Sequence, residues 1–177
     1  MPYVVRIETG YMDRDQYKIA MLYRPGKPWT PFSPQQQWDH KLLIMHGASC
    51  AAQYKTGAAP DVTGSSNVTS PTGRYALGKG FMTMSTALDN SGHDCNVAIQ
   101  AESLVMAKQY IATHYGLLRY TIGTGCSGGS LAVQWVANAY PGVYQGILPT
   151  CSFPDAMTSA TQVADYALLE RYWLTLN

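Results

Sequence analysis

The stretch Arg119–Tyr140, RYTIGTGCSGGSLAVQWVANAY, constrains the fold more than any other part of this chain. It begins with an apolar run of strand length, Tyr120–Ile122, and ends in apolar residues spaced with the period of a helix. Between these two parts lie four closely spaced glycines: Gly123, Gly125, Gly128 and Gly129. The pattern predicts a strand that turns sharply, at the glycines, into a helix.

Within that turn, the residues from Gly125 to Gly129 read Gly-Cys-Ser-Gly-Gly, which fits the pattern G-x-S-x-G. Glycines on both sides of a serine remove Cβ atoms that would collide in a tight strand-to-helix turn, and the serine hydroxyl is left exposed. The first amide groups of the helix can stabilise a developing oxyanion. We therefore predict a nucleophile elbow, with Ser127 as the nucleophile and Gly128 as an oxyanion donor.

Two other interpretations of the same glycines stay open. One is a tightly packed strand-to-helix turn without chemistry, and the other is a phosphate-binding turn. The residues from Gly123 to Gly128 also fit G-x-G-x-x-G. That pattern usually belongs to the first strand–helix unit of a fold, and here no acidic residue closes a following strand at the usual distance. The nucleophile interpretation is the one we favour.

A second feature lies upstream of the elbow. Lys41–Met45 (KLLIM) is a short apolar run without alternation, as expected of a strand buried on both faces. It is followed directly by His46, Gly47 and Ala48. A glycine at this place lets backbone N–H groups approach a bound oxyanion closely. We predict that these three residues form the second half of an oxyanion hole; the alternative is a strand-end turn with a structural histidine.

The rest of the chain alternates between strand and helix patterns. Tyr3–Met12 and Gln16–Tyr23 predict an antiparallel hairpin. The further predicted elements are a short helix around Arg74–Leu77, a strand at Phe81–Leu88, a helix at Val97–Tyr115 capped by Asn96, a strand at Tyr144–Cys151 and a helix at Ala156–Leu176. This order predicts the α/β class: a mostly parallel sheet with an antiparallel N-terminal hairpin and helices on both faces. The length of 177 residues suits one domain, 1–177.

Composition limits the function classes. A net charge of +1 gives nucleic acid binding no electrostatic support, and no apolar run approaches the length of a membrane span. No cofactor fingerprint and no metal-ligand cluster rises above background, so neither a cofactor nor a metal is expected. The low charged content of 13% favours a secreted or periplasmic protein. Four cysteines allow two disulfides in three connectivities: Cys50, Cys95, Cys126 and Cys151.

On these motifs the chain resembles the α/β-hydrolase superfamily, in which a hairpin precedes the oxyanion-loop strand and the elbow sits on a later central strand. Gly-Cys-Ser-Gly-Gly-Ser, starting at Gly125, narrows the resemblance to secreted esterases of the tannase and feruloyl-esterase type. In those enzymes a cysteine directly precedes the nucleophile. Tyr140–Asp155 also resembles an uncharacterised group of bacterial secreted hydrolases. The resemblance implies a serine esterase that cleaves carboxylic esters through an acyl-enzyme on Ser127.

The tannase-like resemblance also implies a disulfide between the cysteine before the nucleophile and one beside the catalytic histidine. That second cysteine is absent here. Cys151, at the end of the neighbouring predicted strand, is the substitute partner for Cys126. Cys50 and Cys95, both on loops at the carboxyl edge of the sheet, then make the second pair.

The catalytic triad is where the chain departs from the family. There the acid and the histidine follow the serine, whereas no histidine follows Ser127 here. Either the chain is truncated before the family's histidine loop, or another group acts as base. His93 is the best internal candidate, because it follows a strand that would end at the same edge; the alternative is a surface-loop histidine. Asp155, after the strand that follows the elbow, is the predicted acid, and Asp165 is the runner-up.

Two functions of different class follow from these observations. The first is ester hydrolysis with a small-molecule or polymeric ester as substrate; amide or lactone hydrolysis by the same machinery is its close variant. The second is an inactive or incomplete hydrolase-fold module that acts by association with another chain. An exposed sheet edge would then pair with a partner, for example as a homodimer.

Overall fold

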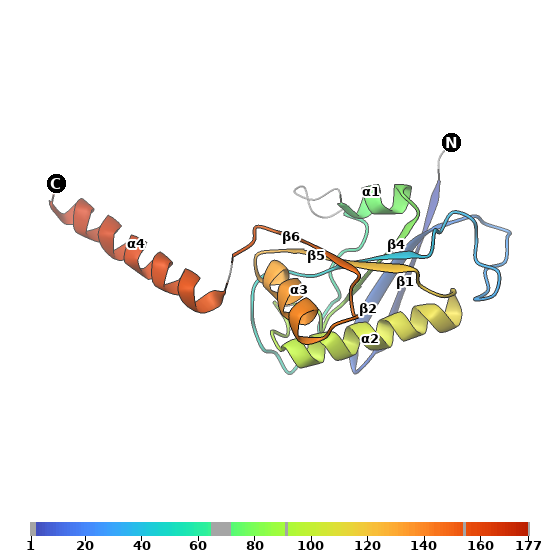
Figure 1. Cartoon of the computed structure of the whole chain (residues 1–177), viewed down its shortest axis with the longest axis horizontal. Helices are drawn as coiled ribbons and strands as arrows, with labels where there is room; N and C mark the ends of the chain where they lie inside the picture. Colours follow the sequence, from blue (N-terminus) through green and yellow to red (C-terminus); the bar gives the residue numbers. More distant parts are fainter. Residues whose placement is uncertain (1–2, 65–71, 91, 154, 177) are drawn as a thin grey trace.

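The computed structural model describes residues 3–64, 72–90, 92–153 and 155–176 (Figure 1). Within these ranges, six strands form one mixed sheet in the order β1-β2-β4-β3-β5-β6. The strands are β1 (Val4–Met12), β2 (Asp15–Tyr23), β3 (Lys41–Met45), β4 (Phe81–Thr86), β5 (Tyr120–Cys126) and β6 (Gly146–Thr150). The helices are α1 (Thr72–Gly78), α2 (Val97–His114), α3 (Gly128–Ala139) and α4 (Ala156–Leu176).

The sheet begins antiparallel and continues parallel, which confirms the predicted α/β class. β1 and β2 form the predicted hairpin, and β2 pairs antiparallel with β4. From β4 onward the neighbours β4–β3, β3–β5 and β5–β6 are all parallel. The loops that follow β3, β4, β5 and β6 therefore leave the sheet at one common edge, where ligand sites of open α/β sheets lie.

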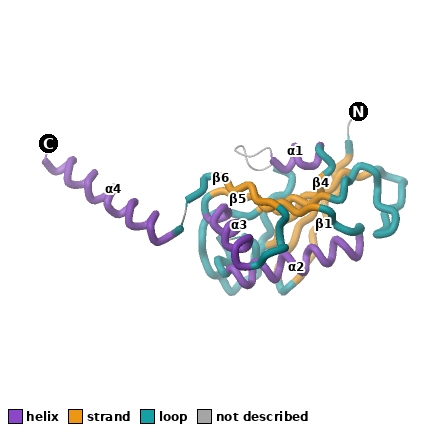
Figure 2. Tube along the Cα trace, in the orientation of Figure 1, coloured by secondary structure: helices purple, strands orange, loops and turns teal. Residues whose placement is uncertain are grey.

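Helices cover both faces of the sheet. α1 lies on one face, and α2 and α3 lie side by side on the other (Figures 1 and 2). The core between the sheet and α2 consists of fully buried apolar side chains: Ile19, Leu42, Ile44, Met82, Met84, Leu104 and Ile111. α2 starts at the predicted cap, because the Asn96 side chain accepts hydrogen bonds from the amides of Ala98 (3.0 Å) and Ile99 (3.3 Å).

Strand β5 is longer than its apolar run predicted. It continues through Gly123 and Gly125 to Cys126, so two of the four glycines belong to the strand and not to the turn. Glycine is required at both strand positions, because neighbouring groups occupy the space that a side chain would need. A Cβ on Gly123 would lie 2.8 Å from the ring of Tyr144, and one on Gly125 would lie 2.6 Å from the backbone of Gly129.

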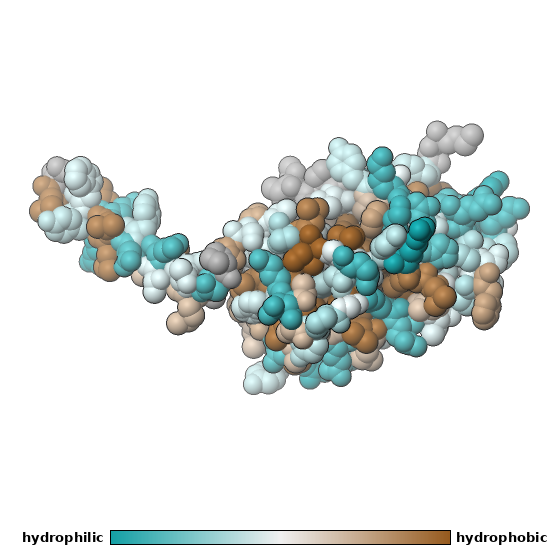
Figure 3. Space-filling view, viewed as in Figure 1, coloured by the Kyte–Doolittle hydropathy of each residue, from teal (hydrophilic) through white to brown (hydrophobic). Residues whose placement is uncertain are grey.

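The predicted C-terminal helix is present as α4, which projects away from the sheet (Figures 1 and 2). Hydrophobic residues are scattered along its surface (Figure 3). Nine large apolar side chains on this helix are between 62% and 80% exposed: Met157, Val163, Tyr166, Leu168, Leu169, Tyr172, Trp173, Leu174 and Leu176. Strand β6, from which α4 continues, is an edge strand of the sheet.

Both inferred disulfides form. Cys50 is bonded to Cys95, and Cys126 is bonded to Cys151. Two disulfides are consistent with an extracytoplasmic location, where such bonds persist. Among the described helices, none has the length and apolar character that crossing a membrane requires.

Candidate active site

Ser127 lies at the sharp turn between β5 and α3, as the sequence predicts. Its φ of 56° and ψ of −121° are a conformation that side-chain-bearing residues rarely adopt. Such strain is typical of functional positions that the surrounding structure holds in place. The residue is exposed, and its side chain makes no capping hydrogen bond to the helix. The hydroxyl of Ser127 is thus presented at the carboxyl edge of the sheet.

The glycines around Ser127 let three pieces of backbone meet. A Cβ on Gly128 would overlap the carbonyl oxygen of Ser49, and one on Gly129 would lie 2.8 Å from the carbonyl oxygen of Gly47. The loop after β3 therefore packs directly on the first turn of α3. Only glycine permits this close approach.

This packing brings together all four residues that the sequence assigns to the oxyanion hole. His46, Gly47 and Ala48 leave β3 beside the elbow strand, and the His46 amide donates to the carbonyl of Thr124 (2.9 Å). Gly128 is the first residue of α3. Backbone amides near a helix N-terminus are suited to stabilising an oxyanion. The amide of His46 is not available for this role, because the sheet already uses it in the bond to Thr124. The role of Gly47, Ala48 and Gly128 remains a prediction.

The side chain of His46 is buried below the elbow. Its Nδ1 lies 3.0 Å from the carbonyl oxygen of Asp89, and its Nε2 lies 2.6 Å from the hydroxyl of Tyr144. Burial lowers the pKa of His46 to about 4, although the bond to Asp89 partly opposes this shift. His46 is therefore neutral at pH 7.

Asp89 follows β4 and is fully buried. One carboxyl oxygen accepts a hydrogen bond from the amide of Thr86 (3.1 Å), while Oδ1 has no hydrogen-bond partner among the described residues. Burial raises the pKa of Asp89 well above its ordinary value, and the bond to Thr86 opposes this only in part. Tyr144 also has a pKa well above the ordinary value, because of burial and of the nearby Asp89.

His46 and Asp89 contribute to stability with opposite pH dependence. The folded-state pKa of His46 lies below its ordinary value of 6.5, so only the unfolded chain takes up this proton between pH 6.5 and about 4. Stability then falls as the pH falls through that range. For Asp89 only the unfolded chain releases its proton above pH 3.8, so stability falls as the pH rises. The two contributions oppose each other over the shared range.

The variant Asp89→Asn should separate the contributions of His46 and Asp89 to stability. Asparagine keeps the shape and an oxygen for the Thr86 amide but cannot ionise, so the variant gains stability over the wild type as the pH rises above 3.8. The gain should be about 1.4 kcal/mol per pH unit until Asp89 ionises in the folded protein. Urea unfolding of both proteins at several pH values measures it. If the unfolding free energies of the two proteins differ by the same amount at every pH, Asp89 is already ionised in the folded chain. The variant His46→Asn tests the opposite pH dependence, that of His46, in the same way.

His93, the predicted base, lies on the loop after β4, at the same sheet edge as Ser127. Its Nε2 is 2.8 Å from the Oδ2 of Asp15, and both side chains are buried. Asp15 begins β2 and also accepts the amide of Gly57 (2.7 Å). Within the described ranges the structure gives no hydrogen bond between His93 and Ser127. His93 and Asp15 line a cavity of about 790 Å³, together with Arg14. The catalytic role of His93 remains a prediction.

Asp155, the predicted acid, caps α4. Its carboxylate accepts hydrogen bonds from the amide (2.6 Å) and the hydroxyl (2.8 Å) of Thr158. These bonds hold the pKa of Asp155 below its ordinary value. Among the described residues, no histidine is hydrogen-bonded to Asp155, and the runner-up Asp165 lies on exposed α4. The triad role of Asp155 is likewise untested and stays a prediction.

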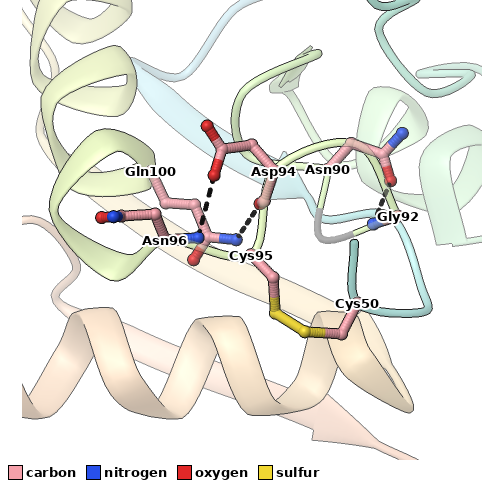
Figure 4. The surroundings of a disulfide bond; sticks show 7 residues. All are labelled: Cys50, Asn90, Gly92, Asp94, Cys95, Asn96 and Gln100. Carbon is pink, nitrogen blue, oxygen red and sulfur yellow. Dashed lines mark hydrogen bonds between the residues drawn. A yellow bond between two sulfur atoms is a disulfide. The ribbon is translucent and has the colours of Figure 1, made fainter. Parts of the chain in front are cut away.

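The loops at this edge are fixed to one another by covalent and polar links. Figure 4 shows Cys50, which follows the His46–Ser49 loop, bonded to Cys95 in the loop that carries His93. That second loop is braced where the Asp94 carboxylate accepts the amide of Asn96 (3.0 Å) and the Asp94 carbonyl accepts the Gln100 side chain (2.9 Å). The Cys126–Cys151 bond similarly joins the elbow to the end of β6.

Three residues of this region escape the sequence analysis: Asp15, Asp89 and Tyr144. The only available signal was that Asp89 is an acidic residue at the end of an apolar strand pattern. Tyr144 is one of 13 tyrosines, and nothing in its neighbourhood distinguishes it.

Several solved structures resemble the fold of this chain at low sequence identity. No curated protein matches the chain. Oligopeptidase B from Leishmania major has a TM-score of 0.53 and 14% identity over 89% of this chain, which spans 21% of that protein. Dienelactone hydrolase from Anabaena variabilis has a TM-score of 0.44 and 15% identity, covering 83% of this chain and 62% of that one. Inhibited esterase B from Lactobacillus rhamnosis has a TM-score of 0.45 and 16% identity, covering 75% and 40%.

The match to oligopeptidase B, together with the strand order, shows an α/β-hydrolase-like fold. A family profile matches residues 1–177, the whole chain. The chain belongs to the tannase-like family of unknown function DUF6351.

Proposed function

We propose that this protein is a serine hydrolase that cleaves carboxylic esters through an acyl-enzyme on Ser127. The observation that supports this most strongly is the geometry of the elbow. Ser127 is exposed in a strained turn, and the backbone of the His46–Ser49 loop packs on the helix that begins directly after it. A Gly-rich phosphate-binding turn would not need a strained serine at its tip.

The proposed reaction follows from this arrangement. The Oγ of Ser127 attacks the ester carbonyl, and the amides of Gly128 and of the loop residues 47–49 stabilise the negative oxygen of the tetrahedral intermediate. The C–O bond to the alcohol part of the ester then breaks, and the leaving alkoxide takes up the proton that Ser127 has lost. Water adds to the acyl-enzyme, releases the acid and returns a proton to Ser127. The proposal assigns no base, because His93 is held by Asp15 and has no hydrogen bond to Ser127 within the described residues.

A serine-directed fluorophosphonate tests the proposal, because the probe reacts covalently only with an activated serine. We expect one label per chain in the wild type and none in Ser127→Ala, as measured by intact mass. Wild-type protein that stays unlabelled under conditions that label a known serine esterase would contradict the proposal.

One observation favours a second candidate function, a module that acts by association with another chain. α4 exposes nine large apolar side chains, and apolar residues on all sides are typical of helices that become buried. It continues from β6, an edge strand that offers its backbone for pairing. Light scattering on the probe-treated protein distinguishes the two candidates. Protein that has taken up no label and has twice the monomer mass would favour association.

A further inference from the structure

His46 is held by the fold at both of its ring nitrogens. Nδ1 faces the carbonyl oxygen of Asp89, which only accepts hydrogen bonds, so Nδ1 carries the proton. Nε2 is then unprotonated and accepts the hydroxyl proton of Tyr144 at 2.6 Å. The two contacts select one tautomer of the ring and one orientation.

This arrangement leaves His46 no part as the base of the reaction. Its free electron pair is already used by Tyr144, and the ring is 8% exposed. Removing the proton of Ser127 would require His46 to break that contact. The buried ring of His46 can instead affect the loop geometry, because the backbone of His46 begins the His46–Ser49 loop.

The backbone of His46 connects the ring to the candidate oxyanion hole. Its amide is bonded to Thr124 on β5, and its carbonyl oxygen would lie 3.1 Å from a Cβ on Gly129. Fixing the ring therefore fixes the residue from which Gly47 and Ala48 continue. A shift of about 1 Å in a group that contacts the reacting atoms can reduce the rate about 100-fold.

Tyr144 reaches this place from the far side of the elbow strand. It lies in the segment before β6, and its ring packs over Gly123 of β5, where a Cβ would come within 2.8 Å of the ring. Lys108 of α2 fixes the same segment by donating to the carbonyl oxygen of Val143 (2.6 Å). The tyrosine hydroxyl is thus presented to the end of β3 by rigid elements.

We propose that Tyr144 is a positioning residue for ester hydrolysis: through its hydrogen bond to His46 it sets the backbone of the His46–Ser49 loop in the geometry that accepts an oxyanion. This inference rests on the proposed function of Ser127. It assigns Tyr144 no contact with substrate. Tyr144 should affect the stability of the transition state, in which the oxyanion is present, more than the binding of substrate.

The kinetic test compares Tyr144→Phe with Tyr140→Phe in the hydrolysis of p-nitrophenyl acetate. Tyr140 is the C-cap residue that follows α3, four positions before Tyr144, and it is 38% exposed, which makes it the matched control. We expect Tyr144→Phe to lower kcat about 10- to 100-fold with KM changed less than about 2-fold. The control should match the wild type. In a His46→Asn background, Tyr144→Phe should have little further effect, because the ring nitrogen it serves is already gone. Equal kcat in wild type and Tyr144→Phe would overturn the inference.

An NMR measurement keeps the inference separate from the proposed function. The wild type should show a protonated Nδ1 and an unprotonated Nε2 on His46 at neutral pH. The amide resonances of Gly47, Ala48 and Ser49 should shift in Tyr144→Phe and not in Tyr140→Phe. If wild type is inactive but these shifts occur, positioning stands and ester hydrolysis fails. If the amides do not shift, or if Nε2 carries the proton, positioning is overturned whatever the activity.

Discussion

Replacing Ser127 by alanine should lower kcat/KM for p-nitrophenyl acetate by at least about 10³-fold, because the acyl-enzyme can no longer form. The fold should be unaffected, since alanine removes an exposed hydroxyl that does not cap α3. The rate is measured from the absorbance of the released nitrophenolate, and urea unfolding checks that stability is unchanged.

Ser152→Ala is the matched control for this prediction. Ser152 lies directly after Cys151, and its hydroxyl contacts only the side chain of Gln134 (3.1 Å) among the described residues. It should hydrolyse the ester at the wild-type rate. Hydrolysis that survives in Ser127→Ala would mean that the activity arises elsewhere. If Ser127 proves essential, His93→Gln next asks whether that histidine, despite its bond to Asp15, is the base.

Gly128→Ala should destabilise the protein by about 3 kcal/mol or more and abolish most of the esterase activity. Alanine normally stabilises a helix by about 1 kcal/mol relative to glycine. Here its Cβ would overlap the carbonyl oxygen of Ser49, so the oxyanion loop must move away from α3. Overpacking of this kind costs about 1 to 3 kcal/mol, and more where backbone is displaced. Thermal and urea unfolding measure the change.

Gly78→Ala provides the comparison for Gly128→Ala. Gly78 is the last residue of α1, is exposed, and has open space where a Cβ would be added. This variant should be as stable as the wild type or slightly more so. An equally mild effect of Gly128→Ala would show that the loop after β3 adapts easily, which would weaken its assignment as a preorganised oxyanion site.

The sequence predicts those parts of the structure that depend on neighbouring residues. The glycines around Ser127, the apolar run of β3 and the Asn96 cap act within one turn or strand, so their patterns predict the sharp turn after β5, the position of β3 and the start of α2. The two disulfides follow from the tannase-like resemblance, which implies a bond at Cys126, with Cys151 at the end of the neighbouring strand as the substitute partner.

Contacts between distant residues are not recoverable in this way. His46 and Tyr144 are 98 residues apart, and Asp15 and His93 are 78 apart. Nothing local marks either pair, because a tyrosine before β6 or an aspartate at a hairpin turn fits its own surroundings without a partner. The extent of β5 depends on a distant contact as well. The sequence around Gly123 is typical of a turn, but the ring of Tyr144 occupies the space beside Gly123 within the strand.

The Cys126–Cys151 bond has a consequence for whatever binds α4. Cys151 is fixed to the residue before Ser127, and α4 begins five residues later, at Ala156. Five residues span at most roughly 18 Å. A polypeptide that covers the first turns of α4 would therefore be held near Ser127, at an effective concentration on the order of millimolar. A side chain from such a polypeptide, including a proton acceptor, would meet Ser127 as if it were part of the same chain.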